Sequence, residues 1–213
     1  SNVKFIKADV NIYNDIVPVF GRYNFDYVFH YAAMVGVKRT LENPISVLED
    51  IEGIKNILSL SKNSGIKRVF YSSSSEVYGE PFEIPQNENT TPLNSRLPYA
   101  IVKNVGEAFF KSYYQEYGLE YTIFRFFNTY GPNQSEDFVV PKFLKAALAN
   151  EPIYLYGNGL QTRSFCFVDD LVEGIFRLLL SDYAEPVNIG NPDEITISDF
   201  ADFVIQTHLQ HLM

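Results

Sequence analysis

A tyrosine and a lysine stand four positions apart in the chain, at Tyr99 and Lys103. On a helix, this spacing places the phenol and the ammonium on the same side. A free tyrosine titrates at about pH 10, and a neighbouring cation lowers that pKa by stabilising the phenolate, so the pair could act as a general base near neutral pH. The hydroxyl of Ser74, further upstream, could bridge a substrate oxygen and the phenol. The same spacing also occurs in ordinary surface helices, so the pair alone does not decide the function.

Apolar strands and amphipathic helices alternate around this pair. One helix is expected to begin with Asn43 as N-cap and Pro44 as first residue, and to end at Gly65. A second helix is expected over residues 99–117, closed by Gly118. The expected strands are residues 3–7 (VKFIK), 27–33 (YVFHYAA), 68–72 (RVFYS) and 121–126 (YTIFRF). This alternation predicts βαβ units and an α/β fold, with a doubly wound parallel sheet covered by helices on both faces.

The pattern changes after Gly131 and Pro132. Beyond this point we expect a smaller lobe, interleaved with the sheet, and we divide the chain into residues 1–132 and 133–213. The elements expected here are helices over residues 138–149 and 169–180, short strands over 153–155 and 187–189, and a last helix capped by Thr196.

Parallel sheets bind ligands beyond the carboxyl ends of their strands. The residues just past the expected strands are therefore candidates for a binding site, although small and polar residues commonly end strands in any case. They are Asp9 and Val10, Ala32 and Ala33, the run Ser72, Ser73, Ser74, Ser75 and Glu76, and Phe126 with Asn128.

Composition and charge exclude several classes of protein. The 17 Lys and Arg against 26 Asp and Glu give a net charge of −9, so the chain is a poor candidate for binding nucleic acid or an anionic membrane. No apolar run approaches the ~18–20 residues that span a bilayer, and the first residues do not resemble a signal peptide. A single cysteine, Cys166, fits a reducing compartment, and we expect a cytoplasmic protein. The three histidines and this cysteine form no metal-binding set, so no metal is expected.

Several segments together resemble a known family, the extended short-chain dehydrogenase/reductases that act as NAD-dependent nucleotide-sugar epimerases, dehydratases and decarboxylases. The resemblance runs from Asp9 to Pro192 in family order and implies a Rossmann-like fold. The segments that carry it are residues 27–33 (YVFHYAA), 42–44 (ENP), 72–79 (SSSSEVYG), 99–103 (YAIVK), 125–132 (RFFNTYGP), 156–165 (YGNGLQTRSF), 168–170 (VDD) and 188–192 (NIGNP).

The resemblance implies a role for each matching position. Tyr99 would remove the proton of a sugar hydroxyl while hydride passes to NAD, and Lys103 would lower the pKa of Tyr99 and hold the nicotinamide ribose. The implied catalytic set is Ser74, Tyr99, Lys103 and Glu76. The implied cofactor-binding set is Asp9, Val10, Ala32, Ala33, Ser72, Tyr99, Lys103 and Phe126. The implied substrate-binding set is Ser74, Ser75, Asn128, Val140, Tyr156 and Arg163, with Arg163 gripping the diphosphate of the nucleotide sugar.

One family feature is missing from this sequence. The glycine-rich G-x-x-G-x-x-G loop, which places a helix N-terminus at the cofactor's diphosphate, does not occur in it, nor does the acidic residue that follows the loop. We therefore expect both the NAD-binding domain, residues 1–132, and the substrate lobe, residues 133–213, to be incomplete relative to the family. This absence also motivates the alternative of a chain that binds a nucleotide sugar without catalysis.

Three reactions remain open for the parent enzyme. We expect a UDP-hexose 4-epimerase first, because oxidation and hydride return at C4 need only Ser74, Tyr99 and Lys103. UDP-glucuronate decarboxylases and GDP-mannose 4,6-dehydratases carry a hydroxyl-Ser-Glu run that Ser74, Ser75 and Glu76 match. The dTDP-glucose 4,6-dehydratases carry Asp where this chain has Ser75, which disfavours that enzyme.

The resemblance also implies a homodimer, formed through the helix that carries Tyr99 and Lys103 and through its neighbour. Aromatic residues on that helix could supply the surface, or could simply belong to the core. They are Phe110, Tyr113, Tyr114 and Tyr117.

Overall fold

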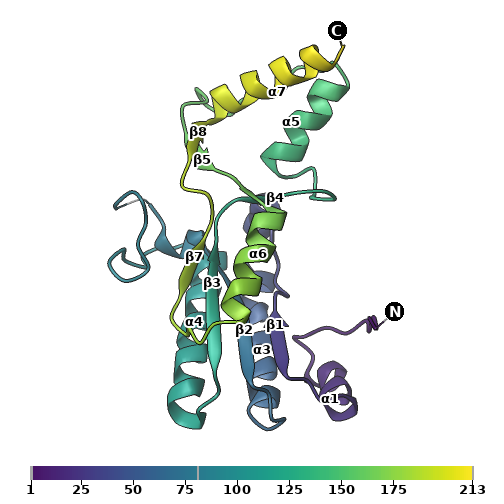
Figure 1. Ribbon diagram of the computed structural model, residues 1–213, viewed down its shortest axis with the longest axis vertical. Coiled ribbons are helices and arrows are strands. Elements are labelled where there is room, and N and C mark those ends of the chain that lie inside the picture. Colours follow the sequence, from purple (N-terminus) through teal and green to yellow (C-terminus); the bar gives the residue numbers. More distant parts are fainter. Residues whose placement is uncertain (1, 81, 213) are drawn as a thin grey trace. The chain divides into compact units, whose positions relative to one another are not determined.

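Four strands form one sheet, in the order β1 (Tyr27–His30), β2 (Arg68–Ser74), β3 (Tyr121–Phe126) and β7 (Val187–Ile189). β1 pairs in parallel with β2, and β2 pairs in parallel with β3 (Figure 1). Val69 to Ser74 of β2 are all buried, as expected for a central strand covered on both faces. The predicted α/β fold with a parallel sheet is confirmed.

The computed structural model describes residues 2–80 and 82–212. The chain divides into two compact units, of which the first comprises Ser1–Phe126 with Ser181–Asn188, and the second comprises Phe127–Leu180 with Ile189–Met213. The sheet lies mainly in the first unit. The second unit begins directly after β3, at Phe127 rather than at residue 133.

The helices α3 (Pro44–Ser61) and α4 (Pro98–Tyr117) pack against each other in the first unit, and α4 also packs against β2 and β3. α1 (Tyr13–Arg22) packs against α3, and the short α2 (Val37–Glu42) precedes it. The core between these helices and the sheet is apolar and closely packed. Its fully buried members include Val47, Leu58, Val69, Tyr71, Phe110 and Ile123.

The ends of these helices follow the sequence only in part. Gly118 closes α4 with φ +66°, and its amide donates to the carbonyl of Tyr114 at 2.8 Å. The helix end predicted at this glycine is confirmed. Pro44 begins α3, but the Asn43 side chain donates back to the Arg39 carbonyl at 3.1 Å and does not cap the helix. α3 also ends at Ser61, before Gly65.

Two predicted strands are wrong. Residues 3–7 are irregular and their apolar side chains stand in solvent, with Phe5 91% exposed. A strand exists only through ladder hydrogen bonds to a neighbour, and the sheet of the described residues ends at β1. Residues 153–155 are likewise irregular, and β1 ends at His30, so Ala32 and Ala33 lie in the loop beyond it.

The described residues of the second unit form short strands and three helices. Its strands pair as β4 (Thr129–Tyr130) with β6 (Cys166–Phe167), and β5 (Thr162–Ser164) with β8 (Glu194–Thr196). Its helices are α5 (Val139–Leu148), α6 (Val168–Leu179) and α7 (Ile197–Leu212). The amide of Asp199 donates to Thr196 Oγ1 at 3.0 Å, which confirms the predicted N-cap of α7.

The aromatic residues of α4 are divided between core and surface. Phe110 is 1% exposed and Tyr113 packs on the core, whereas Tyr114 and Tyr117 are 47% and 52% exposed. In the described part of the chain, no helix combines the length and the apolar character that a bilayer span requires.

Candidate active site

Lys103 is buried at the carboxyl end of the sheet. Its ammonium donates to the carbonyl of Ser72 at 2.6 Å and lies 3.4 Å from the Ser72 hydroxyl. Burial lowers the pKa of Lys103 to about 8, while the charge of Asp50 acts in the opposite direction. The side chain is therefore a cation at neutral pH that loses its proton only slightly above it.

Tyr99 lies one turn before Lys103 on α4, and the Lys103 ammonium is 5.7 Å from the centre of its ring. Burial raises the pKa of Tyr99, a side-chain hydrogen bond with Ser74 lowers it, and the charges of Glu76 and Asp50 raise it. The net direction is upward. Desolvation of the phenolate outweighs the hydrogen bond with Ser74, and the lowering of this pKa by Lys103 stays a prediction.

The serine run ends β2 and begins a short 3-10 helix, η1 (Ser75–Tyr78). Ser74 is 8% exposed and its Oγ accepts from the amide of Glu76 at 3.2 Å, which caps η1. The carboxylate of Glu76 is exposed and acts on the pKa of Tyr99. The structure therefore brings together Ser72, Ser74, Glu76, Tyr99 and Lys103 from two elements, β2 with its following turn and α4.

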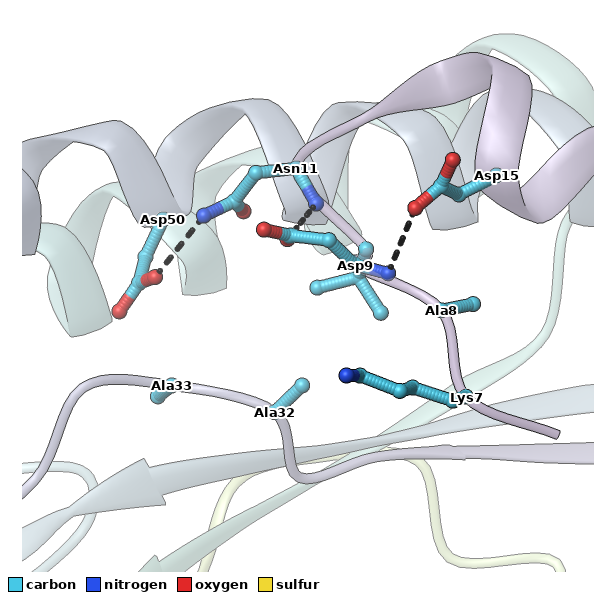
Figure 2. Close-up of a pocket in the computed structure, with 9 residues that line it drawn as sticks. Lys7, Ala8, Asp9, Asn11, Asp15, Ala32, Ala33 and Asp50 are labelled. Atoms are coloured by element: carbon cyan, nitrogen blue, oxygen red, sulfur yellow. Dashed lines mark hydrogen bonds between the residues drawn. The ribbon is translucent and has the colours of Figure 1, made fainter. Parts of the chain in front are cut away.

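A second group of predicted residues surrounds a cavity of about 470 Å³. Asp9 lies on one side, and Ala32 and Ala33, from the loop after β1, lie on the other (Figure 2); Val10 also lines the cavity. Figure 2 also shows Lys7 pointing into the space between them. Ala32 and Ala33 lie beyond the carboxyl end of β1, where parallel sheets bind ligands, whereas Asp9 and Val10 come from the irregular segment before α1.

The cavity wall is held by carboxylates that the sequence did not single out. Asp50 of α3 accepts from the Met34 amide at 2.6 Å and from Asn11 Nδ2 at 3.3 Å. Asp15 accepts from the amide of Asp9 at 3.1 Å. An aspartate in mid-helix reads as a solvent-facing residue, so only the fold reveals that Asp50 links the cavity with the charge of Lys103.

The predicted substrate-binding residues, apart from Ser74 and Ser75, lie in the second unit and are described there by themselves. Val140 is buried on α5, whereas Asn128 and Tyr156 are exposed. Arg163 is exposed on β5, where its guanidinium donates to the Thr162 carbonyl at 2.7 Å. Phe126, the last residue of β3, is half-buried and pairs with Ser74.

The side chains that line the cavity are chemically compatible with a nucleoside. Small side chains leave the space open at Ala8, Ala32 and Ala33, and the carboxylates of Asp9 and Asp50 are acceptors suited to ribose hydroxyls and an adenine amine. The sequence contains no G-x-x-G-x-x-G loop, so we assign none of its residues to the diphosphate of the cofactor. Within residues 2–80 and 82–212, no three His, Cys, Asp or Glu side chains gather into a group that could hold a metal ion.

Comparison with known proteins decides the family. The model of the NAD dependent epimerase/dehydratase family matches residues 1–190. The chain belongs to this family. The motifs in the sequence agree with the properties of this family, namely a Rossmann-type fold, dependence on NAD and action on nucleotide sugars.

The relatives of this epimerase/dehydratase chain are named after different reactions. UDP-glucuronic acid decarboxylase 6 of Arabidopsis thaliana is 39% identical over 186 residues, which cover 84% of this chain and 54% of that protein. The UDP-glucose 4-epimerase of Thermotoga maritima, solved with UDP-glucose, has a TM-score of 0.92 at 27% identity and covers 97% of this chain and 69% of that one. This chain spans about half the length of the curated relatives that it matches.

A dehydratase of the same family is also similar. A double mutant of the dTDP-glucose 4,6-dehydratase of Streptomyces venezuelae, solved with NAD, has a TM-score of 0.85 at 27% identity, covering 93% of this chain and 62% of that one. An epimerase/dehydratase-type activity is therefore supported at the level of the family, while the individual reaction differs between the relatives.

Proposed function

We propose that this chain carries the catalytic groups for NAD-dependent oxidation of a nucleotide sugar at C4. The observation that carries the proposal is the meeting of Ser74, Tyr99 and Lys103 at the carboxyl end of the sheet. Asp50 connects this group electrostatically with the cavity that we propose as the adenosine site. Such a cluster of perturbed titratable groups beside a cavity is a common sign of a catalytic centre.

In this proposal each side chain has one task. Tyr99 removes the proton of the sugar C4 hydroxyl, and Ser74 shares a hydrogen bond with that oxygen and with the phenol. Lys103, cationic below pH 8 or so, stabilises the phenolate as it forms. NAD, when bound, supplies the acceptor for the C4 hydride. Burial raises the pKa of Tyr99, so the proposal assigns Lys103 the task of favouring the deprotonated tyrosine during the reaction.

The fate of the 4-keto sugar separates the candidate reactions. We favour a UDP-glucuronate decarboxylase, because the relative at 39% identity carries that name and the run Ser74, Ser75, Glu76 matches that class. A 4-keto uronic acid is a β-keto acid: its carboxylate leaves as CO₂, C5 takes a proton, and hydride returns to C4. The net products are a UDP-pentose and CO₂, with no net redox change.

A UDP-hexose 4-epimerase is the second candidate, favoured by the TM-score of 0.92 to an epimerase. In this reaction the keto sugar rotates in the site, so that the hydride returns to the opposite face of C4. No atoms are lost. Dehydration, in which water leaves the sugar, is the third outcome within the family and is represented by the Streptomyces venezuelae dehydratase.

One experiment separates these candidates. The purified chain is incubated with NAD and with UDP-glucuronic acid, UDP-glucose or dTDP-glucose, and the products are identified by mass spectrometry and proton NMR. The proposal expects CO₂ and a UDP-pentose from UDP-glucuronic acid only. Formation of UDP-galactose from UDP-glucose would select the epimerase, and a product lighter by one water would select a dehydratase.

The cofactor is tested separately from turnover. The chain is denatured, released small molecules are identified by mass spectrometry, and NAD binding to the native chain is measured by calorimetry. Release or binding of NAD supports the cavity at Asp9 and Ala33 as its adenosine site. A nucleotide sugar that binds while NAD does not would favour the alternative of a non-catalytic binding chain.

A further inference from the structure

A buried ion pair joins α4 to β3. The side chains of Glu107 and Arg125 are 3% and 2% exposed. Arg125 Nε and Nη2 donate to the two oxygens of Glu107 at 2.9 and 2.7 Å, in the bidentate geometry of a strong charge-assisted pair. Burying such a pair removes water from both charges, and this cost can exceed the attraction between them. A gain in stability therefore does not by itself explain why the pair is buried.

The glutamate of this pair holds the residue before Ser74. The hydroxyl of Ser73 donates to Glu107 Oε1 at 2.6 Å, and the Ser73 side chain is almost fully buried. Glu107 follows Lys103 by one turn, as Lys103 follows Tyr99. The three side chains therefore form a row on one face of α4 that meets Ser74, Ser72 and Ser73 of β2.

The arginine holds the residue that ends η1. Arg125 Nη1 donates to the hydroxyl of Tyr78 at 2.8 Å, and that hydroxyl donates to Asn188 Oδ1 at 2.7 Å. Tyr78 is fully buried, and its ring also lies under the guanidinium, 4.9 Å from it. Both ends of the segment 74–77, which contains Ser74, Ser75 and Glu76, are thus bonded to the same ion pair.

We propose that the Glu107–Arg125 pair is a clamp that positions the segment 74–77 against Tyr99, through Ser73 at one end and Tyr78 at the other. Glu107 and Arg125 are positioning residues, because they act through these two neighbours. The inference rests on the proposed function, since the segment is expected to contain groups that meet the substrate.

Two variants release one end of the segment each and leave the ion pair in place. Ser73→Ala removes the bond to Glu107, and Tyr78→Phe removes the bonds to Arg125 and Asn188. Ser61→Ala is the matched control: Ser61 is also a buried serine of the first unit, but its hydroxyl has no hydrogen-bond partner among the described residues.

The first readout is amide hydrogen exchange by NMR. The Glu76 amide donates to Ser74 Oγ, and the Gly79 amide donates to the Glu76 carbonyl at 3.2 Å, so both report opening of the segment. The Val69 amide, bonded to the Glu120 carbonyl at 2.9 Å, reports the core. We expect exchange at Glu76 in Ser73→Ala and at Gly79 in Tyr78→Phe to rise by about five- to tenfold, with Val69 unchanged.

The second readout is the ¹³Cζ resonance of Tyr99, assigned by its loss in Tyr99→Phe. This resonance responds to hydrogen bonding of the phenol, and we expect it to shift in Ser73→Ala as the contact with Ser74 loosens. Ser61→Ala should move neither readout.

Two results would overturn the clamp. Unchanged exchange at Glu76 and Gly79, with an unchanged Tyr99 resonance, would show that the segment does not depend on the pair. An equal acceleration of the segment and of Val69 would show a role in global stability only. Neither readout requires turnover, so failure of the proposed reaction would leave this test intact, and failure of the clamp would leave the proposed reaction intact.

Discussion

The ammonium of Lys103 is buried against the Ser72 carbonyl and beside two tyrosine rings, those of Tyr71 and Tyr99. His30, 4% exposed and stacked on Tyr71, has its pKa lowered to about 4 by burial and by the charge of Lys103, so it is neutral at physiological pH. Asp50 supplies the compensating negative charge from α3. At the scale of the residue, the chemistry of the site thus depends on the buried Lys103 cation, whose pKa is lowered.

The pKa of Lys103 makes stability depend on pH. Its folded value of about 8 lies below the ordinary 10.5, so between these pH values the unfolded chain holds a proton that the folded chain has lost. The free energy of unfolding therefore rises with pH over this window, by roughly 3 kcal/mol for this residue. Urea titrations of the chain and of Lys103→Met at pH 7, 8, 9 and 10 check this: the free energy of unfolding of the chain should rise relative to that of the variant as the pH rises. A constant difference between the two would contradict the lowered pKa.

Arg163 tests the proposed binding of the nucleotide diphosphate. Its guanidinium is exposed and offers several donors, so Arg163→Ala should weaken UDP binding by about 1.5–3 kcal/mol, the range for a charge-assisted hydrogen bond. Isothermal titration calorimetry with UDP measures this. Arg177→Ala is the control, because Arg177 is also exposed in the second unit but bonds to Glu173 on α6. Equal affinities in the chain and in Arg163→Ala would remove this residue from the site.

At the scale of the element, α4 determines the site, because it carries Tyr99, Lys103 and Glu107 in one row facing β2. The helix approaches the strand closely at Gly106, whose missing side chain makes room for the Tyr71 hydroxyl. The Tyr71 hydroxyl in turn donates to the Lys103 carbonyl at 3.4 Å.

Gly106→Ala should therefore damage both the packing and the site. An ideal Cβ at this position collides with the Tyr71 ring and hydroxyl, so α4 must move away from β2, and we expect a loss of about 1–3 kcal/mol in the free energy of unfolding. Gly21→Ala in α1 is the control, because nothing lies within 4 Å of its Cβ, and there we expect no loss. Chemical denaturation measures both. Equal stability of the two variants would contradict the close approach at Gly106.

The elements that could be predicted from the sequence are those with a local signal. The strand over residues 121–126 and the end of α4 at Gly118 follow from apolar runs and a C-capping glycine, and both are confirmed. Residues 3–7 carry the same kind of run, yet a strand needs a paired neighbour that a local pattern does not reveal. α1 was missed because Pro18 lies inside it.

The residues of the candidate site also divide into those with a local sequence signal and those without one. Tyr99 and Lys103 are visible as a spacing, and Ser74 as a hydroxyl at the end of a strand. Asp50, Asn11 and the partnership of Glu107 with Ser73 were not visible, because they join segments between 34 and 39 residues apart in the chain. The net upward direction of the Tyr99 pKa was also not visible in the sequence, since it depends on burial.

At the scale of the whole molecule, a homodimer remains a prediction. Tyr114 and Tyr117 of α4 leave aromatic surface exposed next to α3, which we propose as the contact with a second copy. Sedimentation equilibrium should show a dimer, and the double variant Tyr114→Ser, Tyr117→Ser should shift it to monomer. The control is Tyr183→Ser, which alters an exposed tyrosine elsewhere in the first unit. A monomeric chain at micromolar concentration would contradict the proposed surface.

The proposed oxidation at C4 is tested most directly by replacing Tyr99, the residue that we propose removes the C4 hydroxyl proton. The chain and Tyr99→Phe are compared for turnover of UDP-glucuronic acid and UDP-glucose with added NAD, after circular dichroism has shown both to be folded. We predict turnover by the chain and a loss of about 10²–10⁴-fold in Tyr99→Phe, the usual contribution of a positioned general base. Turnover in Tyr99→Phe equal to that of the chain, or none in either protein, would contradict the proposal.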